Sequence, residues 1–231
     1  MNITAFTATG DRPEAFELCK AWMNLQTVKP YQWIIVDDGV SPSVPPLGVD
    51  YLYREEFRDR RTSLNKKVQF ILEHDLVKGD ALAFIEDDDW YAPTYLEGVA
   101  AKMGGADVFG EGRAIYYNVR NRHWFDNQNE AHASLCQTAV SRDFLPMIRE
   151  LLGLDIVTQL DAQVWPKSTH GLVTNPLDGP HNCIGMKGMP GRIGMVYCFH
   201  EDVFGAPDPD LTKLRELIGD DAELYAQFFK P

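Results

Sequence analysis

The stretch that decides the fold is ALAFIEDDDWYAP, residues 81–93. Its first five residues are apolar, as in a strand that is buried on both faces. The apolar run stops at four consecutive acids, Glu86, Asp87, Asp88 and Asp89. Carboxylates ~5 Å apart repel each other by roughly 1 kcal/mol even in water, and a hard divalent cation with oxygen ligands removes that cost. A helix start at Asp89, with Pro93 in its first turn, explains one or two of the acids, so the run predicts a metal site.

The residues on either side of this stretch alternate between strand and helix patterns. Strands are expected over residues 2–9, 32–36 and 49–53, and helices over 13–25, within 58–74 after a basic loop, and over 94–103. A strand, a helix and a second strand at this spacing form a parallel unit with a right-handed crossover. The first 105 residues or so therefore predict a doubly wound α/β sheet.

The second half of the chain has a less regular pattern. Strands are expected over residues 107–117, 123–125, 135–140, 171–175 and 195–200, with a turn at 118–122, and short helices over 144–152 and 158–165. A glycine-rich loop spans residues 185–194, and residues 207–229 contain an amphipathic helix.

Composition restricts the classes of function. The net charge of −12 argues against a general affinity for phosphate backbones, although residues 54–67 are locally basic. No apolar run approaches the ~20 residues of a membrane span, and the N-terminus does not have the pattern of a signal peptide. The four cysteines form no CxxC pair, which favours free thiols in a reducing, cytoplasmic compartment.

A second pair of acids, Asp37 and Asp38, follows the strand over residues 32–36. The carboxyl ends of parallel strands meet at one edge of a sheet, so this pair, the acids at 86–89 and the end of the first strand share that edge. The first strand contributes Thr7, Ala8 and Thr9. Three arginines near the same edge offer forked donors to phosphate: Arg12, Arg60 and Arg61. A nucleotide diphosphate bridged by a cation fits this set, and neither a P-loop nor a G-x-G-x-x-G run is present.

Three segments carry a resemblance to a known family: TATGDR at 7–12, IIVDDG at 34–39 and FIEDDDWYAP at 84–93. Together they resemble the nucleotide-binding half of GT-A glycosyltransferases, and family 2 in particular. The resemblance covers residues 1–105 well and the remainder loosely. It implies the GT-A α/β fold, with a mainly parallel central sheet flanked by helices and a less regular acceptor-side half. We therefore expect a single domain over residues 1–231: a nucleotide-sugar half (1–105), an acceptor half (106–205) and a C-terminal helix (206–231).

The resemblance also implies roles for the acids in the first half. Asp38, together with Asp37, corresponds to the acid that binds uracil. Glu86 or Asp87 corresponds to the ribose ligand and Asp88 to the ligand of Mn²⁺ or Mg²⁺. Glu86 departs from the family pattern, which more often has Asp at that position.

Further roles follow for the second half. Asp161, within LDAQVW at 160–165, resembles the position of the general base that takes the acceptor hydroxyl proton, with Asp155 as the second candidate. His200 resembles a late histidine that completes the metal site. Lys187 and Arg192, at the two ends of residues 187–192, are expected to close over the diphosphate.

The expected activity is therefore metal-dependent transfer of a sugar from a nucleotide-sugar, a UDP-sugar, to an acceptor hydroxyl. Inversion follows if Asp161 is the base. The acceptor stays open: it is a saccharide, a lipid-linked acceptor, a protein, or a hydroxymethylated DNA base approached through residues 54–67. Two alternatives are a non-catalytic nucleotide- or sugar-binding module and a haloacid dehalogenase-like phosphatase. The phosphatase is disfavoured because its motif has Thr or Val two places after the second Asp. Here the run Asp87-Asp88-Asp89 is followed by Trp90 and Tyr91.

Overall fold

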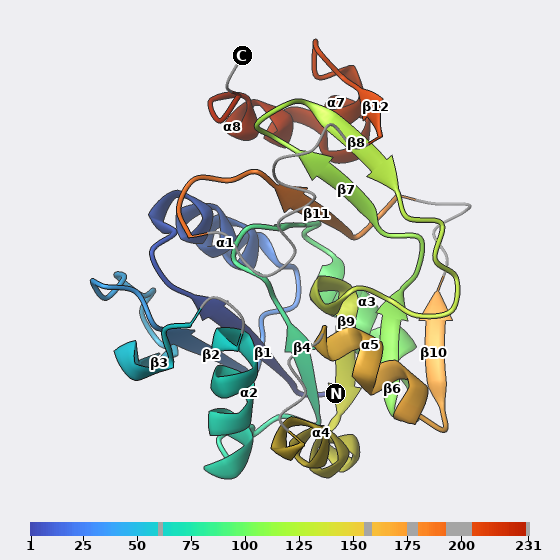
Figure 1. Ribbon diagram of the computed structural model, residues 1–231. Helices are drawn as coiled ribbons and strands as arrows, with labels where there is room; N and C mark the ends of the chain where they lie inside the picture. The colour runs from blue at the N-terminus through green and yellow to red at the C-terminus, as the bar shows by residue number, and fades with distance from the viewer. Residues whose placement is uncertain (60–61, 155–158, 175–179, 193–204, 230–231) are drawn as a thin grey trace.

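A computed structural model describes residues 1–59, 62–154, 159–174, 180–192 and 205–229, and it contains two β-sheets (Figure 1). The larger sheet has seven strands in the order β10-β6-β9-β4-β1-β2-β3. Their bounds are β1 (Ile3–Thr9), β2 (Gln32–Asp37), β3 (Asp50–Tyr53), β4 (Ala81–Phe84), β6 (Val108–Glu111), β9 (Thr138–Ser141) and β10 (Gly171–Thr174). Only β9 runs antiparallel to its neighbours, so the other strands end at one common edge.

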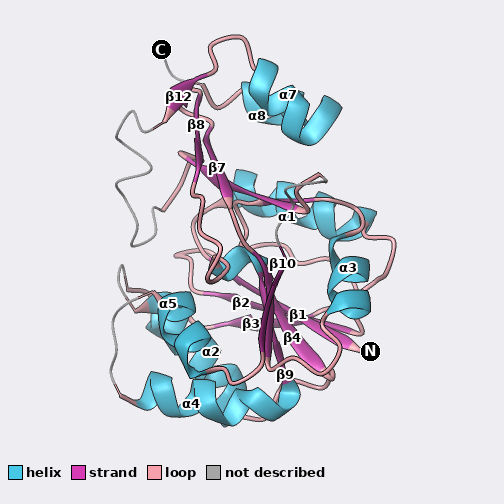
Figure 2. Cartoon of the chain, turned by 90° about the vertical axis from the view of Figure 1, so that its right-hand side faces the viewer, coloured by secondary structure: helices cyan, strands magenta, loops and turns pink. Residues whose placement is uncertain are grey.

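Helices cover both faces of the large sheet (Figure 2). The helices are α1 (Pro13–Leu25), α2 (Ser63–Glu73), α3 (Tyr95–Lys102), α4 (Leu145–Gly153) and α5 (Leu160–Val164). Side chains of α1 and α3 belong to one hydrophobic core, and those of α2, α4 and α5 belong to another. In β2, successive side chains point to opposite faces of the sheet: Ile35 lies in the first core and Ile34 in the second. This two-sided burial explains why the strands are continuous apolar runs in the sequence.

The smaller sheet has five strands in the order β12-β8-β7-β11-β5. Its strands are β5 (Trp90–Tyr91), β7 (Ile115–Asn118), β8 (His123–Asp126), β11 (Cys183–Lys187) and β12 (Ala206–Pro207). The C-terminal helices α7 (Thr212–Ile218) and α8 (Ala222–Ala226) pack into the first core, where Trp22 Nε1 donates to Tyr225 Oη at 3.1 Å. Short 3₁₀ turns are η1 (Glu55–Phe57), η2 (Leu135–Gln137), η3 (Arg142–Phe144), η4 (Trp165–Lys167) and η6 (Gly219–Asp221).

The α/β fold expected from the sequence is confirmed, and several elements of the second half differ from expectation. The pattern over residues 107–117 forms two strands in different sheets, separated near Arg113, whose φ is 52°. The predicted start of the glycine-rich loop over 185–194 is wrong, because residues 185–187 belong to β11 and pair with β7. The expected C-terminal helix is two helices, divided at Gly219 with a φ of 61°. The strand expected over 195–200 lies outside the described residues.

Two features concern the organisation of the whole chain. Strands from before and after residue 105 share the seven-stranded sheet, so the two predicted halves have a common core. Within the described segments, no helix has the length and apolar character that crossing a membrane requires.

Candidate active site

Thr9, the last residue of β1, joins the two groups of acids. Its backbone carbonyl accepts a hydrogen bond from the Asp38 backbone N–H at 3.2 Å. Its hydroxyl donates to Asp87 Oδ2 at 2.8 Å. The acids after β2 and the acids after β4 therefore lie on either side of a single residue, as the parallel topology predicts.

Asp38 is fully buried and is surrounded by donors. Lys67 Nζ lies 2.8 Å from its Oδ1, Ser63 Oγ donates to its Oδ2 at 2.6 Å, and Arg192 also contacts Oδ1. Burial alone raises the pKa of Asp38, but the hydrogen bond from Arg192 and the charge of Lys67 outweigh burial and hold the pKa below its usual value. Asp38 is therefore an ionised acceptor near neutral pH.

Asp37 has a different set of partners. Its Oδ1 accepts from the Gly39 backbone N–H at 2.8 Å, and its Oδ2 accepts from the Ser43 backbone N–H at 2.7 Å and from Tyr51 Oη at 2.8 Å. Against the effect of burial, these bonds lower the pKa of Asp37. Asp37 thus stabilises the loop that follows β2, and its part in binding a base stays a prediction.

Lys67 and Ser63 were not among the predicted site residues. Lys67 Nζ also donates to the Thr9 carbonyl at 2.6 Å, and its side chain is 2% exposed. The sequence did contain a sign that Lys67 is buried. Lys67 lies on the apolar side of α2, next to Val68 and four residues before Ile71. A lysine on the buried face of a helix needs a carboxylate partner.

The acids after β4 are partly neutralised by two cations of the chain. Arg12 Nη1 lies 2.9 Å from Asp87 Oδ1, and Arg12 Nη2 contacts Asp88. Lys187 Nζ lies 3.3 Å from Asp89 Oδ1 and 4.0 Å from Asp88 Oδ2. Arg12 and Lys187 therefore reach the acids from different segments of the chain.

The remaining charge in this group raises pKa values. Burial, followed by the charge of Asp89, raises the pKa of Glu86 to about 8. Burial, opposed by Lys187 and reinforced by the charge of Asp88, raises the pKa of Asp89 to about 6. Negative charge is thus incompletely compensated by Arg12 and Lys187.

The acids offer a set of donors that suits a hard cation. Glu86, Asp88 and Asp89 each have a ligand oxygen, and these oxygens lie within 4.8 Å of one another. Carboxylate oxygens are the ligands that Mn²⁺ and Mg²⁺ prefer, and a divalent cation would relieve the repulsion that raises the Glu86 pKa. The carboxylates present, Asp88 included, therefore fit the predicted metal, and the role of Asp88 as its ligand stays a prediction.

Asp161 is in the first turn of α5 and is partly buried. Burial raises the pKa of Asp161, which suits a group that takes up a proton. The charge of Asp161 also contributes to the raised pKa of Glu86, so the two carboxylates interact. The role of Asp161 as the general base stays a prediction. The second candidate, Asp155, lies outside the described residues.

Lys187 and Arg192 lie at the two ends of the segment that follows β11. Lys187 is the last residue of that strand, and Arg192 contacts Asp38. Between them, Gly191 has a φ of 100°, and a Cβ there would lie 2.3 Å from the Asp11 carbonyl oxygen. The Arg192 backbone N–H donates to the same oxygen at 3.2 Å, so this segment rests on the turn after β1.

The other predicted residues fall into two groups. The Thr7 hydroxyl accepts from Trp33 Nε1 at 3.0 Å, which fixes a core tryptophan, while Ala8 is partly exposed on β1. Arg60, Arg61 and His200 lie outside the described residues.

Glu111 is a further acid that sequence reasoning missed. It ends β6 at the same edge as the other acids, and its Oε1 lies 3.1 Å from His181 Nδ1. The Asn182 side chain donates to its Oε2 at 3.0 Å. The signal was weak, because a lone glutamate after a short strand is common in sequences.

The mainly parallel sheet, with acids after β2 and β4 and a second, smaller sheet starting directly after the acid run, defines the fold as GT-A-like. No protein-family model matches the chain, and no curated protein matches it either. Among solved structures, it is similar to TarS of S. aureus, with a TM-score of 0.54, 13% identity and coverage of 80% of this chain and 37% of TarS.

Two structures of TarS residues 1–349 are also similar. The one in complex with UDP-GlcNAc has a TM-score of 0.53 and 13% identity, and covers 83% of this chain and 60% of that one. The one in complex with UDP has a TM-score of 0.55 and 11% identity, and covers 80% of this chain and 60% of that one. The chain thus spans between about a third and three fifths of these proteins, and the likeness establishes the fold.

Proposed function

We propose that this protein transfers a sugar from a UDP-sugar to an acceptor hydroxyl, with Mn²⁺ or Mg²⁺ as cofactor. The observation that carries the proposal is the junction at Thr9, where a buried, ionised Asp38 lies beside a run of carboxylates suited to a divalent cation. One acid is suited to accept N–H donors from a nucleobase, and the run is suited to a cation on a diphosphate. TarS, which this chain resembles in fold, has been crystallised with UDP and with UDP-GlcNAc, and this supports the same class of ligand here.

In this proposal, Asp38 binds the uracil ring and Lys67 keeps Asp38 ionised and in place. Glu86 or Asp87 binds the ribose, and Asp88 is the principal metal ligand, with His200 as a further one. The cation would act as a Lewis acid that stabilises the departing diphosphate. The chain itself contributes positive charge next to that position through Arg12, Lys187 and Arg192, with Arg60 and Arg61 proposed as additional phosphate donors.

Asp161 is the proposed general base. A carboxylate whose pKa is raised by burial takes the proton of the acceptor hydroxyl more readily than an exposed one. Proton removal on the face opposite the leaving group results in inversion at the anomeric carbon. The acceptor in this proposal is a saccharide, with a hydroxymethylated DNA base as the second class to be screened.

The test is a donor and acceptor screen that measures release of free nucleotide diphosphate. The full chain is incubated with UDP-, GDP- and ADP-sugars, with Mn²⁺ or Mg²⁺, and with saccharide or hydroxymethylated DNA acceptors. We expect UDP release that depends on the metal and is accelerated by one acceptor class. UDP binding without turnover of any donor would instead identify a binding module and would overturn the assignment as an enzyme.

A further inference from the structure

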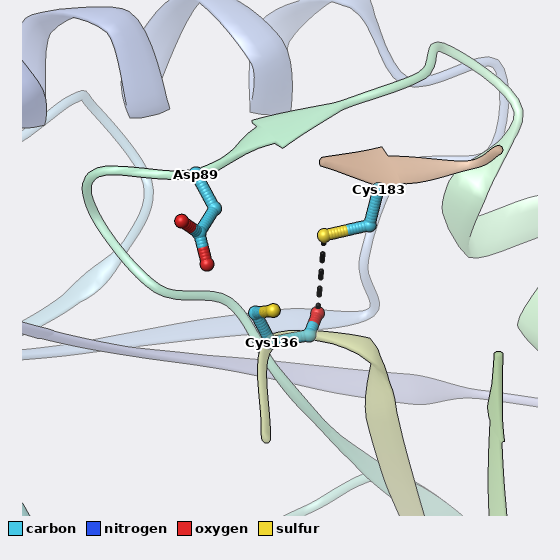
Figure 3. A group of neighbouring side chains, drawn as sticks. All are labelled: Asp89, Cys136 and Cys183. Atoms are coloured by element: carbon cyan, nitrogen blue, oxygen red, sulfur yellow. Dashed lines mark hydrogen bonds between the residues drawn. The ribbon is translucent and has the colours of Figure 1, made fainter. Parts of the chain in front are cut away.

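Asp89, the last residue of the acid run, also belongs to a second group of possible ligands, which it forms with Cys136 and Cys183. The three residues come from distant segments: Asp89 immediately precedes β5, Cys136 is in η2, and Cys183 begins β11. Figure 3 shows their side chains turned toward one another. One ligand atom from each lies within 4.8 Å of the other two.

The group is closed to solvent and contains an unsatisfied anion. Asp89 and Cys183 are fully buried and Cys136 is 3% exposed. Asp89 Oδ1 accepts from the Met186 backbone N–H at 2.7 Å and lies 3.3 Å from Lys187 Nζ. Asp89 Oδ2 is buried and has no hydrogen-bond partner among the described residues. A carboxylate oxygen in this state is costly, so within the segments that the structure describes Oδ2 itself lacks the positively charged or hydrogen-bonding partner that Oδ1 has.

The two sulfur atoms determine which cation suits the gap. A tetrahedral zinc ion holds thiolate sulfurs at about 2.3 Å, which places two such sulfurs about 3.8 Å apart. The three ligand atoms lie within 4.8 Å of one another, which is at most about 1 Å wider than that arrangement. Thiolates select Zn²⁺ and Co²⁺ over Mn²⁺ and Mg²⁺, which prefer oxygen. The oxygen set of Glu86, Asp88 and Asp89 and the set that contains the two thiols thus favour different metals, with Asp89 belonging to both.

We propose that Asp89, Cys136 and Cys183 bind a structural Zn²⁺ ion. Binding replaces the two thiol protons, which leave to solvent, and the thiol of Cys183 gives up its weak hydrogen bond to the Cys136 carbonyl at 3.6 Å. Two thiolates, one carboxylate and Zn²⁺ carry a net charge of −1, which Lys187 offsets. Gln137, the residue after Cys136, also has a buried Oε1 without a partner in the described part of the chain.

The ion would join η2 to both β5 and β11, and so hold Asp89 and Lys187 beneath the proposed nucleotide-sugar site. Gln137 already links these segments, since its Nε2 donates to the Cys183 carbonyl at 3.1 Å. The role is one of support, and it needs neither nucleotide nor turnover. The zinc proposal and the proposed transferase function can therefore fail independently.

The test uses the full chain, purified under reducing conditions, stripped with a chelator and titrated with Co²⁺ in the absence of nucleotide. We expect thiolate-to-cobalt charge-transfer absorption that saturates at about one ion per chain. Excess Zn²⁺ should abolish the absorption by displacement, whereas excess Mn²⁺ should leave it unchanged. Elemental analysis of protein purified without chelator should find zinc.

Matched variants distinguish this site from other thiols. Cys136→Ser and Cys183→Ser should lose the charge-transfer band, and Cys19→Ser should keep it, because Cys19 is a buried free cysteine in α1 outside the group. If the serine variants do not fold, the titration of the wild-type chain with zinc displacement decides. No thiolate absorption in folded wild-type protein, a band that survives both serine changes, or loss of two hydrogens as a Cys136–Cys183 disulfide in the reduced preparation would overturn the proposal.

Discussion

The guanidinium of Arg12 binds the carboxylate of Asp87 at 2.9 Å and also contacts Asp88. The chain therefore places its own cation where a divalent metal is proposed to bind. Arg12 is the residue that precedes α1 and has 15% side-chain exposure, so a metal on Asp88 would compete with its guanidinium. This competition gives the first prediction.

Replacing Arg12 with Gln should tighten Mn²⁺ binding in the absence of nucleotide by roughly tenfold, equivalent to about 1.4 kcal/mol. The reason is that the metal no longer displaces an ion pair from Asp88. Binding can be followed by the electron paramagnetic resonance signal of free Mn²⁺. Arg58→Gln is the control, because Arg58 pairs with Asp11 and not with the acid run. Unchanged or weaker Mn²⁺ affinity in Arg12→Gln would argue against the shared position.

Asp88→Asn should remove the metal dependence of UDP binding. Calorimetry of the wild-type chain is expected to give UDP affinity that requires Mn²⁺ or Mg²⁺, since the cation joins Asp88 to the diphosphate. In Asp88→Asn the affinities with and without metal should be equal and low. Equal UDP affinity with and without metal in the wild-type chain would show that the metal assignment is wrong.

Asp161→Asn should lower turnover by at least ~10² and leave UDP affinity intact, because only proton transfer from the acceptor is lost. Steady-state rates of UDP release and calorimetry with UDP measure the two quantities. Asp143→Asn, an exposed acid in η3, is the matched control and should be neutral. Turnover near that of wild type would exclude Asp161 as the base.

Lys67→Met should destabilise the fold by about 3–5 kcal/mol, because it removes the buried one of the two cations that contact the buried Asp38, the other being Arg192. Urea denaturation near neutral pH measures the free energy of unfolding. Lys66→Met, on the adjacent position of α2, should stay within about 0.5 kcal/mol of wild type. A loss below about 1 kcal/mol in Lys67→Met would mean that Ser63 and Arg192 satisfy Asp38 on their own.

The metal-free protein should become less stable as pH rises from about 5 to about 8. Burial, with the Asp89 charge, raises the pKa of Glu86 from 4.5 to about 8, and burial raises that of Asp89 from 3.8 to about 6. A carboxyl group with a raised pKa in the folded state binds more protons there than in the unfolded chain, so the free energy of unfolding falls as pH rises through this window.

Urea denaturation at several pH values, without divalent cations, measures this slope. Glu86→Gln should flatten it, since the amide does not titrate, while Glu130→Gln, an exposed change, should leave it as in wild type. Stability that rises from pH 5 to 8 in the wild-type chain would contradict the raised pKa values.

The first half of the fold was predictable because its signals are local. Apolar runs at 32–36 and 81–85 are long enough to identify buried strands, and Pro13 marks the start of α1 within the expected bounds. The second half was harder because its strands are short and pair at long range. Residues 107–117 look like one strand, yet β6 and β7 join different sheets.

The sequence by itself determined that the chain is an α/β protein with acids at the ends of two parallel strands. The apolar runs, the alternation of strands with helices and the positions of the acids can all be read from short stretches of sequence. Only the tertiary structure decided what each acid touches. It assigned Asp37 to its own loop and Asp38 to Lys67, and it brought Cys136 and Cys183 to Asp89. The contacts of Asp38 and Asp89 join residues tens of positions apart, and side-chain packing between separate elements, rather than any local pattern, selects them.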